Sequence, residues 1–356
     1  MSDQDLVVET VRDILAAHEP FVLTPSRPWD GALWTALAEA GLTGVGLPEE
    51  AGGSGGELAD AVAVVATLAA GAAAVPVAEQ LLVAGPALVT AGLDLPDPAE
   101  PLSFAIADGV TAEPSDDGDG PGAFVLQGVS ADVAWSGVAR RVAVLVQGPP
   151  RIGGSVLVLV DAARVAAAPG TNLAGEPTGS LDLDGVSAPG ALLTEAQAAV
   201  LRARFALARA VQISAALQQV LAWTVQYAGE REQFGRPLGR FQAIQMELAE
   251  MAGEVTAVAA IVDAAVQALG RGDDVVLAAA AAKVRAGAAV EVVARLAHQV
   301  HGAIGFTQEH KLHHLTRRLW SWRDEAGSEL HWSRVLGAGL LAAGPDALWP
   351  TLTRVV

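Results

Sequence analysis

A long run of apolar residues at helical spacing constrains this chain more than any other feature of its sequence. The run consists of Phe241, Ile244, Leu248, Met251, Val255, Val258, Val262, Ala265 and Leu269. Steps of three and four residues place these side chains on one face of an α-helix of about eight turns. Two further long helices are predicted at about 196–229 and 274–300. Long helices joined by short connections indicate a helical bundle.

The sequence divides into regions of different texture. Residues 1–100 are predicted to be helical, and 195–356 are predicted to be helical again. Between them, residues 101–194 hold short β-branched or alternating segments separated by Gly, Pro and Asp. We therefore expect an α+β protein with a helical N-terminal domain, a central antiparallel β domain and a C-terminal helical-bundle domain. The glycine-rich run Gly52–Gly56 is interpreted as a flexible loop.

Individual elements are predicted within these regions. Strands are expected at Phe104–Ala107, Ala123–Val129, Arg141–Val146, Ser155–Val160 and Ser180–Leu183. The run Glu113–Gly122 is interpreted as a solvated acidic loop, and Asp94–Pro101 as a proline-broken linker. In the N-terminal region, one helix carries Trp34, Leu37, Ala38 and Leu42 on one face, and a second begins at Leu58.

Charge and cysteine content exclude several classes of function. The formal net charge of −18 argues against nucleic acid or an anionic membrane as a partner. The absence of cysteine excludes disulfides, thiolate catalysis and zinc–thiolate sites. No run is judged long and apolar enough to span a membrane, and the acidic N-terminus lacks the basic start of a signal peptide. A cytoplasmic location is therefore expected.

Three motifs follow one another in the C-terminal region. They read Tyr227-Ala228…Arg231…Phe234-Gly235, then Phe241-Gln242…Leu248-Ala249-Glu250-Met251, then Gln299-Val300-His301-Gly302-Ala303-Ile304-Gly305-Phe306-Thr307. A fixed cation and a glycine turn at the head of a long helix form a plausible phosphate-binding corner. In order and spacing the motifs resemble the signature of the acyl-CoA dehydrogenase family. The N-terminal stretch WTALAEAGLTGVGLPEEAGGSGG resembles the first domain of that family. The resemblance implies the family fold, with a C-terminal four-helix bundle.

The resemblance also implies roles for single residues. Arg231 would pair with the FAD pyrophosphate, since the fork of a guanidinium matches phosphate oxygens. Phe234 and Gln242 would line the cofactor. Gln299 and Gly302 would meet the adenosine end of an FAD held mainly by a neighbouring subunit. The other residues expected to bind the cofactor are Val300, Ala303 and Ser328.

Plainer interpretations of some of these residues stay open. Arg231 could form a surface salt bridge with Glu230 or Glu232, and Gln299 could be a polar residue at a helix end. Trp135 lies where the family usually has a strand against the flavin ring. Because the surrounding sequence departs from that pattern, Trp135 is interpreted as packing.

The family removes the substrate α-proton with a glutamate while the flavin takes the β-hydride, and neither usual position holds a glutamate here. Spacing from the motifs places these positions at Ala326 and Phe205. Glu325, the immediate neighbour of the first position, is the candidate catalytic base. Its alternative interpretation is a surface or interfacial carboxylate near Arg323. Proton transfer tolerates little misplacement, so a shift by one residue weighs against the catalytic role.

The stretch Leu312–Trp332 is rich in Arg, His and Trp. Its candidates for binding phosphates of CoA or FAD are Arg317, Arg318 and Arg323. Its histidines include His310, His313 and His314. No supporting carboxylate pattern accompanies these histidines, so no metal site is predicted.

Two functions are compatible with these features. The first is an FAD-dependent acyl-CoA dehydrogenase that desaturates an acyl-CoA thioester, with Glu325 or another carboxylate as the base. The second is a catalytically degenerate subunit that completes the FAD site of a longer homologue, as in heteromeric members that act on bulky steroid-type thioesters. The two missing glutamates and the short β region favour the second function. In both cases the resemblance implies FAD, an acyl-CoA substrate and a homo-oligomer or heteromer.

Overall fold

The computed structural model of the chain describes residues 3–18, 23–24, 27–115, 122–149 and 153–346. The chain forms two compact units. The first consists of Met1–Val65 and Ala73–Phe205, and the second of Ala66–Ala72 and Ala206–Val356. Helices give way to strands after residue 90 and strands to helices after residue 193. The division into three domains at residues 100 and 194 stays a prediction, because the compact units divide the chain differently.

The N-terminal helices of the chain are α1 (Asp3–His18), α2 (Gly31–Glu39), α3 (Leu58–Ala70) and α4 (Gly85–Thr90). The side chain of Asp30 accepts a hydrogen bond from the Leu33 amide at 3.1 Å and so caps α2. A wider π-helical stretch, Glu79–Ala84, leads directly into α4. Leu42 lies in a short turn beyond the end of α2, because Gly41 adopts the left-handed conformation (φ 72°) that terminates the helix.

The glycine-rich run after α2 is a hydrogen-bonded turn. Gly46 donates its amide proton to the Gly55 carbonyl at 2.7 Å, and Gly55 donates to the Leu47 carbonyl at 2.9 Å. Gly53 packs so closely on this turn that an added Cβ atom would lie 2.3 Å from the Leu47 carbonyl oxygen. The run is therefore a packed turn and not the flexible loop expected from its composition.

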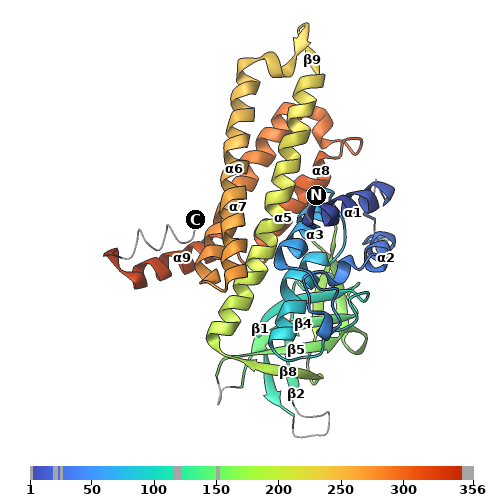
Figure 1. Ribbon diagram of the computed structural model, residues 1–356, viewed down its shortest axis with the longest axis vertical. Coiled ribbons are helices and arrows are strands. Elements are labelled where there is room, and N and C mark those ends of the chain that lie inside the picture. The colour runs from blue at the N-terminus through green and yellow to red at the C-terminus, as the bar shows by residue number, and fades with distance from the viewer. Residues whose placement is uncertain (1–2, 19–22, 25–26, 116–121, 150–152, 347–356) are drawn as a thin grey trace. The chain divides into compact units, whose positions relative to one another are not determined.

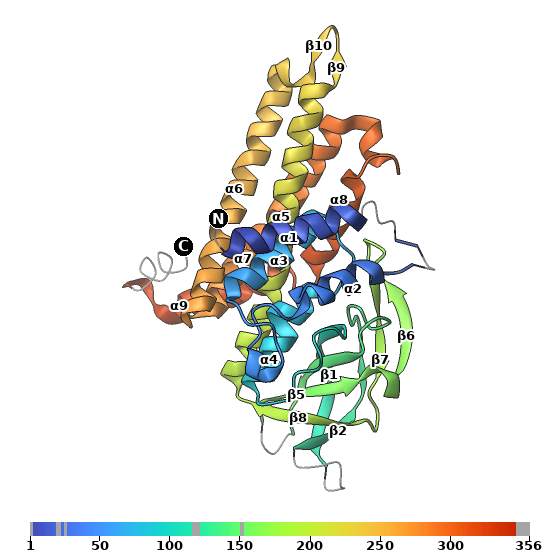
Figure 2. The same ribbon diagram turned by 45° about the vertical axis from the view of Figure 1, so that its right-hand side comes forward.

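The strands of the first unit form a barrel and a small sheet (Figure 2). The closed barrel has the order β1-β2-β8-β5-β4, with β1 (Leu102–Pro114), β2 (Ala123–Gln127), β4 (Arg141–Gln147), β5 (Ser155–Asp161) and β8 (Ser187–Leu193). The second sheet contains β3 (Val129–Ser130), β7 (Pro177–Asp182) and β6 (Ala166–Thr171). All pairs are antiparallel except β1 with β4, which run parallel.

Alternating residues of the strands fill the barrel. The core includes Val142, Val144 and Val146 of β4 and Val156, Val158 and Val160 of β5. This period of two is the one expected for strands with one face inside a barrel. The five predicted strands overlap β1, β2, β4, β5 and β7. Glu113 belongs to β1, and residues 116–121 of the expected acidic loop lie outside the described residues.

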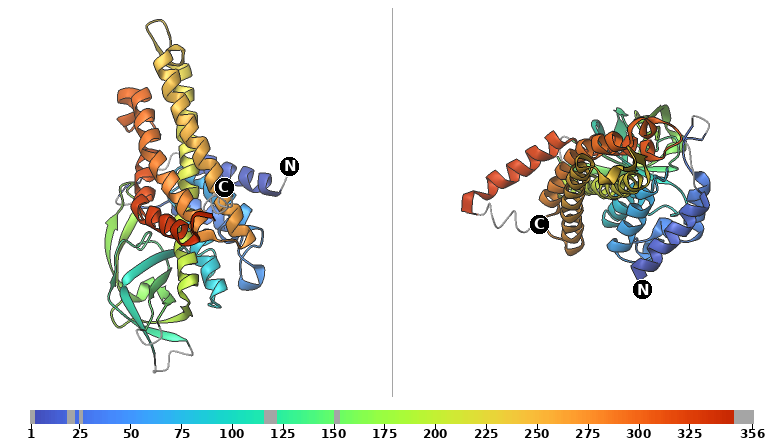
Figure 3. Two further views of the ribbon diagram at one scale, coloured as in Figure 1. Left: turned by 90° about the vertical axis from the view of Figure 1, so that its left-hand side faces the viewer. Right: turned by 90° about the horizontal axis from the view of Figure 1, so that it is seen from above.

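The second unit contains long helices that run side by side (Figures 1 and 3). They are α5 (Glu195–Glu230), which belongs to this unit from Ala206 onward, α6 (Gln242–Arg271) and α7 (Val275–His301), followed by α8 (Leu312–Asp324) and α9 (Glu329–Ala343). The buried residues of α6 are Met251, Val255, Val258, Val262, Ala265 and Ala268. They confirm the C-terminal part of the predicted apolar stripe. Gly272 ends the helix in the left-handed conformation.

By length and composition alone, α5 and α6 are long and apolar enough to cross a membrane. No run of this kind was predicted from the sequence. The criterion is weak, because a buried core helix of a soluble protein also meets it. In α5, 78% of the apolar window is buried, as in such a core helix, whereas in α6 the share is 28%.

Candidate cofactor and catalytic site

A short β-hairpin joins α5 to α6 and carries the first motif (Figure 1). Its strands are β9 (Glu232–Gln233) and β10 (Arg236–Pro237), with Phe234 and Gly235 between them. Both loop residues have positive φ, 50° and 76°, as a two-residue hairpin turn requires. This conformation is unfavourable for a bulky residue, and Phe234 is also 91% exposed. Residues with a strained backbone conformation are often found at binding sites, and Phe234 combines such a backbone with a solvent-exposed aromatic ring.

Arg231 lies at the base of this hairpin with its side chain exposed. Its backbone is fixed, because its amide donates to the Tyr227 carbonyl and its carbonyl accepts from Leu238, both at 2.8 Å. Within the described residues its guanidinium has no ion pair, and Glu230 instead accepts a hydrogen bond from Gln226 at 2.8 Å. The alternative of a salt bridge to Glu230 or Glu232 is therefore not found. The guanidinium is available for an anion from outside the chain.

The start of α6 lies beside the hairpin. The Phe234 and Phe241 rings meet edge to face at 6.3 Å between centroids, and the Arg236 guanidinium lies 4.1 Å from the centre of the Phe241 ring. Gln242, the first residue of α6, is exposed. Arg231, Phe234 and Gln242 thus belong to one exposed end of the second unit.

The C-terminal end of α7 lies close to the last turns of α5, since the Tyr227 and His301 rings stack at 4.5 Å between centroids. Gln299 and Ala303 are exposed here, and Gly302 has a φ of 62° that favours glycine. Val300 is buried, so its side chain belongs to the core. Exposed polar and backbone groups at this helix end fit the expected adenosine contact. Val300 does not offer its side chain for that contact.

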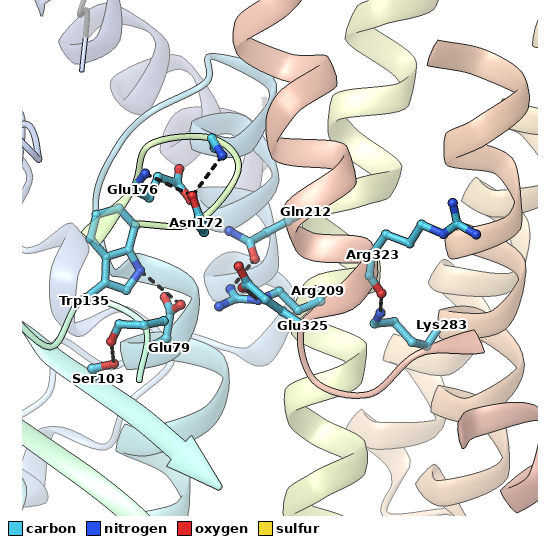
Figure 4. Close-up of polar contacts among 12 residues, drawn as sticks. Glu79, Ser103, Trp135, Asn172, Glu176, Arg209, Gln212, Lys283, Arg323 and Glu325 are labelled. Carbon is cyan, nitrogen blue, oxygen red and sulfur yellow. Dashed lines mark hydrogen bonds and ion pairs between the residues drawn. The ribbon is translucent and has the colours of Figure 1, made fainter. Parts of the chain in front are cut away.

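The candidate base Glu325 lies in the turn between α8 and α9 and is engaged in an ion pair (Figure 4). Its Oε2 atom is 2.8 Å from Nε of Arg209, which lies on α5 and is only 2% exposed. Arg209 also donates from Nη1 to Oε1 of Gln212 at 2.7 Å. Arg323, the partner considered from sequence, instead forms an ion pair with Glu329. Glu325 thus balances a buried charge that gave no sequence signal.

The rest of this turn holds the remaining predicted positions. Ala326 has a φ of 57°, and its carbonyl accepts a hydrogen bond from Nε1 of Trp332 at 2.7 Å. Ser328 is exposed and caps α9, accepting a hydrogen bond from the His331 amide. The other expected base position, Phe205, is buried in the first unit, where its ring meets Phe104 edge to face at 5.2 Å. Neither position therefore offers a carboxylate.

The helix α5 separates the two sets of candidate residues. At a rise of 1.5 Å per residue, Arg209 and the hairpin after Glu230 lie about 30 Å apart along α5. In FAD only a short ribityl chain separates the flavin ring from the pyrophosphate. The Arg231 hairpin and the Glu325 turn therefore lie near different points along α5 and do not form one compact cluster within the chain.

A buried lysine accompanies the ion pair in the second unit. Lys283 is fully buried, and its Nζ donates to the Arg323 carbonyl at 2.6 Å (Figure 4). Burial lowers the pKa of Lys283 to about 8, and the nearby Glu329 partly opposes this shift. Sequence reasoning missed Arg209, Gln212 and Lys283 because each lies within an apolar helical pattern without a local motif.

In the first unit, Trp135 is buried and donates from Nε1 to Oε1 of the buried Glu79 at 3.1 Å (Figure 4). This contact agrees with the interpretation of Trp135 as packing. In the second unit, Arg318 is buried and donates to the His314 carbonyl at 3.1 Å. Arg318 therefore contributes to the interior of its unit. Arg317 remains an exposed candidate for a phosphate.

Five histidines gather at the corner between α7 and α8. They are His298, His301, His310, His313 and His314. The His301 and His310 rings meet at 4.6 Å between centroids, and the His313 and His314 rings at 4.0 Å. The described residues contain no group of His, Asp and Glu side chains able to hold a metal ion.

The β-barrel, the long helices and the hairpin with the exposed Arg231 guanidinium form the arrangement expected for an acyl-CoA dehydrogenase. The N-terminal domain of acyl-CoA dehydrogenases matches residues 1–94, and their C-terminal domain matches residues 194–333. The chain belongs to the acyl-CoA dehydrogenase family, a family of flavoprotein oxidoreductases.

The similar proteins include mycobacterial members of the family. Acyl-CoA dehydrogenase IpdE2 of Mycobacterium tuberculosis is 33% identical over 87% of this chain and 89% of its own length. The ChsE4-ChsE5 complex from Mycobacterium tuberculosis has a TM-score of 0.84 and 26% identity, covering 97% of this chain and 99% of the other. A variant of the Tcur3481-Tcur3483 steroid acyl-CoA dehydrogenase has a TM-score of 0.84 and 27% identity, covering 96% and 98%.

Proposed function

We propose that this chain is a subunit of an FAD-dependent acyl-CoA dehydrogenase that desaturates an acyl-CoA thioester between its α and β carbons. In this proposal the chain supplies Arg231, Phe234 and Gln242 to the cofactor, and a longer homologous subunit supplies the base. FAD, when bound, would supply the acceptor for the hydride that leaves the β carbon. The groups of this chain bind and orient the cofactor.

The observation that carries the proposal is the ion pair of Glu325 with Arg209. A general base has to accept a proton, and protonation of Glu325 would remove the carboxylate charge that pairs with the buried Arg209 guanidinium. The free energy cost of that loss opposes a catalytic role for Glu325. The other base position, Phe205, is apolar, so this chain offers no suitable base at either expected position.

The separation along α5 supports a shared site. The hairpin of Arg231 and the Arg209 partner of Glu325 lie about 30 Å apart along α5, which supports a base on another chain for a flavin that Arg231 contacts. The two similar solved structures named above, ChsE4-ChsE5 and Tcur3481-Tcur3483, each carry the names of two proteins. We extend this pairing to the present chain. The description of the second as a steroid enzyme makes a steroid-derived acyl-CoA the first substrate to test.

A matched pair of carboxylate variants tests which chain carries the base. Glu325 and Glu329 both pair with an arginine and have similar side-chain exposures of 24% and 22%. The chain is co-purified with a longer homologue as Glu325→Gln or as Glu329→Gln, and flavin reduction by acyl-CoA is followed per bound flavin. We expect both variants to reduce flavin at the wild-type rate. Loss of reduction in Glu325→Gln alone, with flavin retained, would make Glu325 the base and this chain a catalytic subunit.

A further inference from the structure

The first unit contains an apolar pocket that none of the motif residues lines. Its volume is about 290 Å³. It lies between α4, the strands β5 and β8, and the first turns of α5. Lining residues include Pro86, Ala87, Leu157, Leu193, Leu201 and Arg204. The wall is thus mainly hydrocarbon, with one permanently charged side chain.

Arg204 is the unusual member of this wall. Its Nε donates to the Leu82 carbonyl at 2.9 Å, in the π-helical stretch before α4. This bond occupies one of the five N–H donors of a guanidinium. No carboxylate of the described residues lies within ion-pair distance of Arg204, whereas Arg202, two residues earlier, pairs with Asp108. Burial without a counter-charge lowers the pKa of Arg204 to about 10, so the side chain stays positive at neutral pH.

A partly buried cation in an apolar wall is stabilised when an anion accompanies it. A neutral apolar ligand would fill the pocket but leave the charge uncompensated. A phosphate would meet the charge but would bring its remaining oxygens against hydrocarbon. A ligand that satisfies both features has one compact negative group and an aliphatic body.

We propose that this pocket binds an aliphatic monocarboxylate, with its carboxylate on Arg204 and its hydrocarbon chain against Ala87, Leu157 and Leu193. At about 30 Å³ per water-sized volume, 290 Å³ accommodates roughly ten non-hydrogen atoms, the size of octanoate. The site lies entirely in the first unit and does not depend on the proposed flavin function. Its failure would leave that function untouched.

The test is calorimetric titration of the purified protein, in the assembly in which it is isolated, with octanoate and with octan-1-ol. Arg204→Met removes the charge, and Arg204→Lys keeps it. Ala87→Phe fills the pocket without touching the arginine; the Ala87 side chain is half-buried, so the larger ring has room to point into the pocket. Thermal melting establishes that each variant is folded.

We expect saturable octanoate binding to the wild type that Ala87→Phe abolishes and Arg204→Lys retains. Arg204→Met should weaken octanoate binding about tenfold, the usual effect of losing a charge-assisted hydrogen bond. It should leave octan-1-ol binding unchanged. Absence of saturable octanoate binding to the wild type would overturn the proposal. So would equal binding by Ala87→Phe, which would place octanoate elsewhere, and this criterion still applies if Arg204→Met fails to fold.

Discussion

Arg209 lies almost fully buried on α5, and its charge is balanced by Glu325 from the turn before α9. Gln212 and the fully buried Lys283 belong to the same polar interior of the second unit. A carboxylate in such a pair holds a buried charge in place, which is a structural task. Glu325 is the immediate neighbour of the expected base position in the sequence. This proximity alone therefore does not make Glu325 a catalytic base.

The structural role of Glu325 predicts a coupling with Arg209. Glu325→Gln and Arg209→Met should each lower the free energy of unfolding by about 1–3 kcal/mol, less than for a fully buried pair because Glu325 is partly exposed. The double variant should lose less than the sum of the two single losses. Urea denaturation of the four proteins measures this coupling. Strictly additive losses would show that the pair makes no contribution.

For Arg231 we predict an effect on flavin binding and not on stability, because its guanidinium has no ion pair among the described residues. Arg231→Ala should weaken flavin retention about tenfold or more by removing charge-assisted contacts to phosphate. The control is Arg271→Ala at the far end of α6, where the arginine pairs with Asp273 on the surface at 2.7 Å. Flavin content after gel filtration is the readout. Full retention in Arg231→Ala would argue against the pyrophosphate role.

The helices and strands of this chain differ in how well they can be predicted from sequence. The stripe of α6 is periodic over its whole length, so the helix is predictable from residues such as Val255 and Val262. Strand β6 has no buried face along Ala166–Thr171, so it lacks an alternating pattern and escaped prediction. The parallel pairing of β1 with β4 depends on contacts remote in sequence. Gly53 was misinterpreted because composition cannot distinguish a packed glycine from a mobile one.

The packed turn at Gly53 can be tested with a single methyl group. Gly53→Ala should destabilise the protein by about 1–3 kcal/mol, because its Cβ would collide with the backbone of Leu47. Gly137→Ala is the matched control in the same unit, since an added Cβ there meets no atom within 4 Å. Thermal denaturation compares the two variants. Equal stability of both would restore the flexible-loop interpretation.

The histidine corner between α7 and α8 predicts acid sensitivity. Burial, with a smaller effect of His313, lowers the pKa of His314 from 6.5 to about 4. The unfolded chain therefore binds more protons than the folded chain below pH 6.5, so this stabilisation is full above that pH and is lost as the pH falls toward 4.

Unfolding midpoints measured across this range should fall less steeply in His314→Gln than in the wild type. His331→Gln is the control, because His331 is exposed on α9. Identical pH profiles for the wild type and His314→Gln would contradict the assignment.

At the scale of the whole molecule, the sequence motifs sufficed to predict the family and its fold. They did not reveal how a complete site is assembled. That conclusion required the long α5, which keeps the Arg231 hairpin and the Glu325 turn at separate places. The pairing of Glu325 with Arg209 also joins a turn and a helix that are distant in sequence, and no local sequence pattern indicates it. In the function proposed here, the base that this chain lacks is supplied by a second subunit.

The measurement that most directly tests this account is the visible absorption spectrum with flavin-to-protein stoichiometry. The chain is purified alone and after co-expression with a longer homologue. We predict little or no flavin on the chain alone and recovery of flavin in the co-purified complex. Close to one flavin per chain in the protein purified alone would contradict the account and indicate a self-sufficient homo-oligomer.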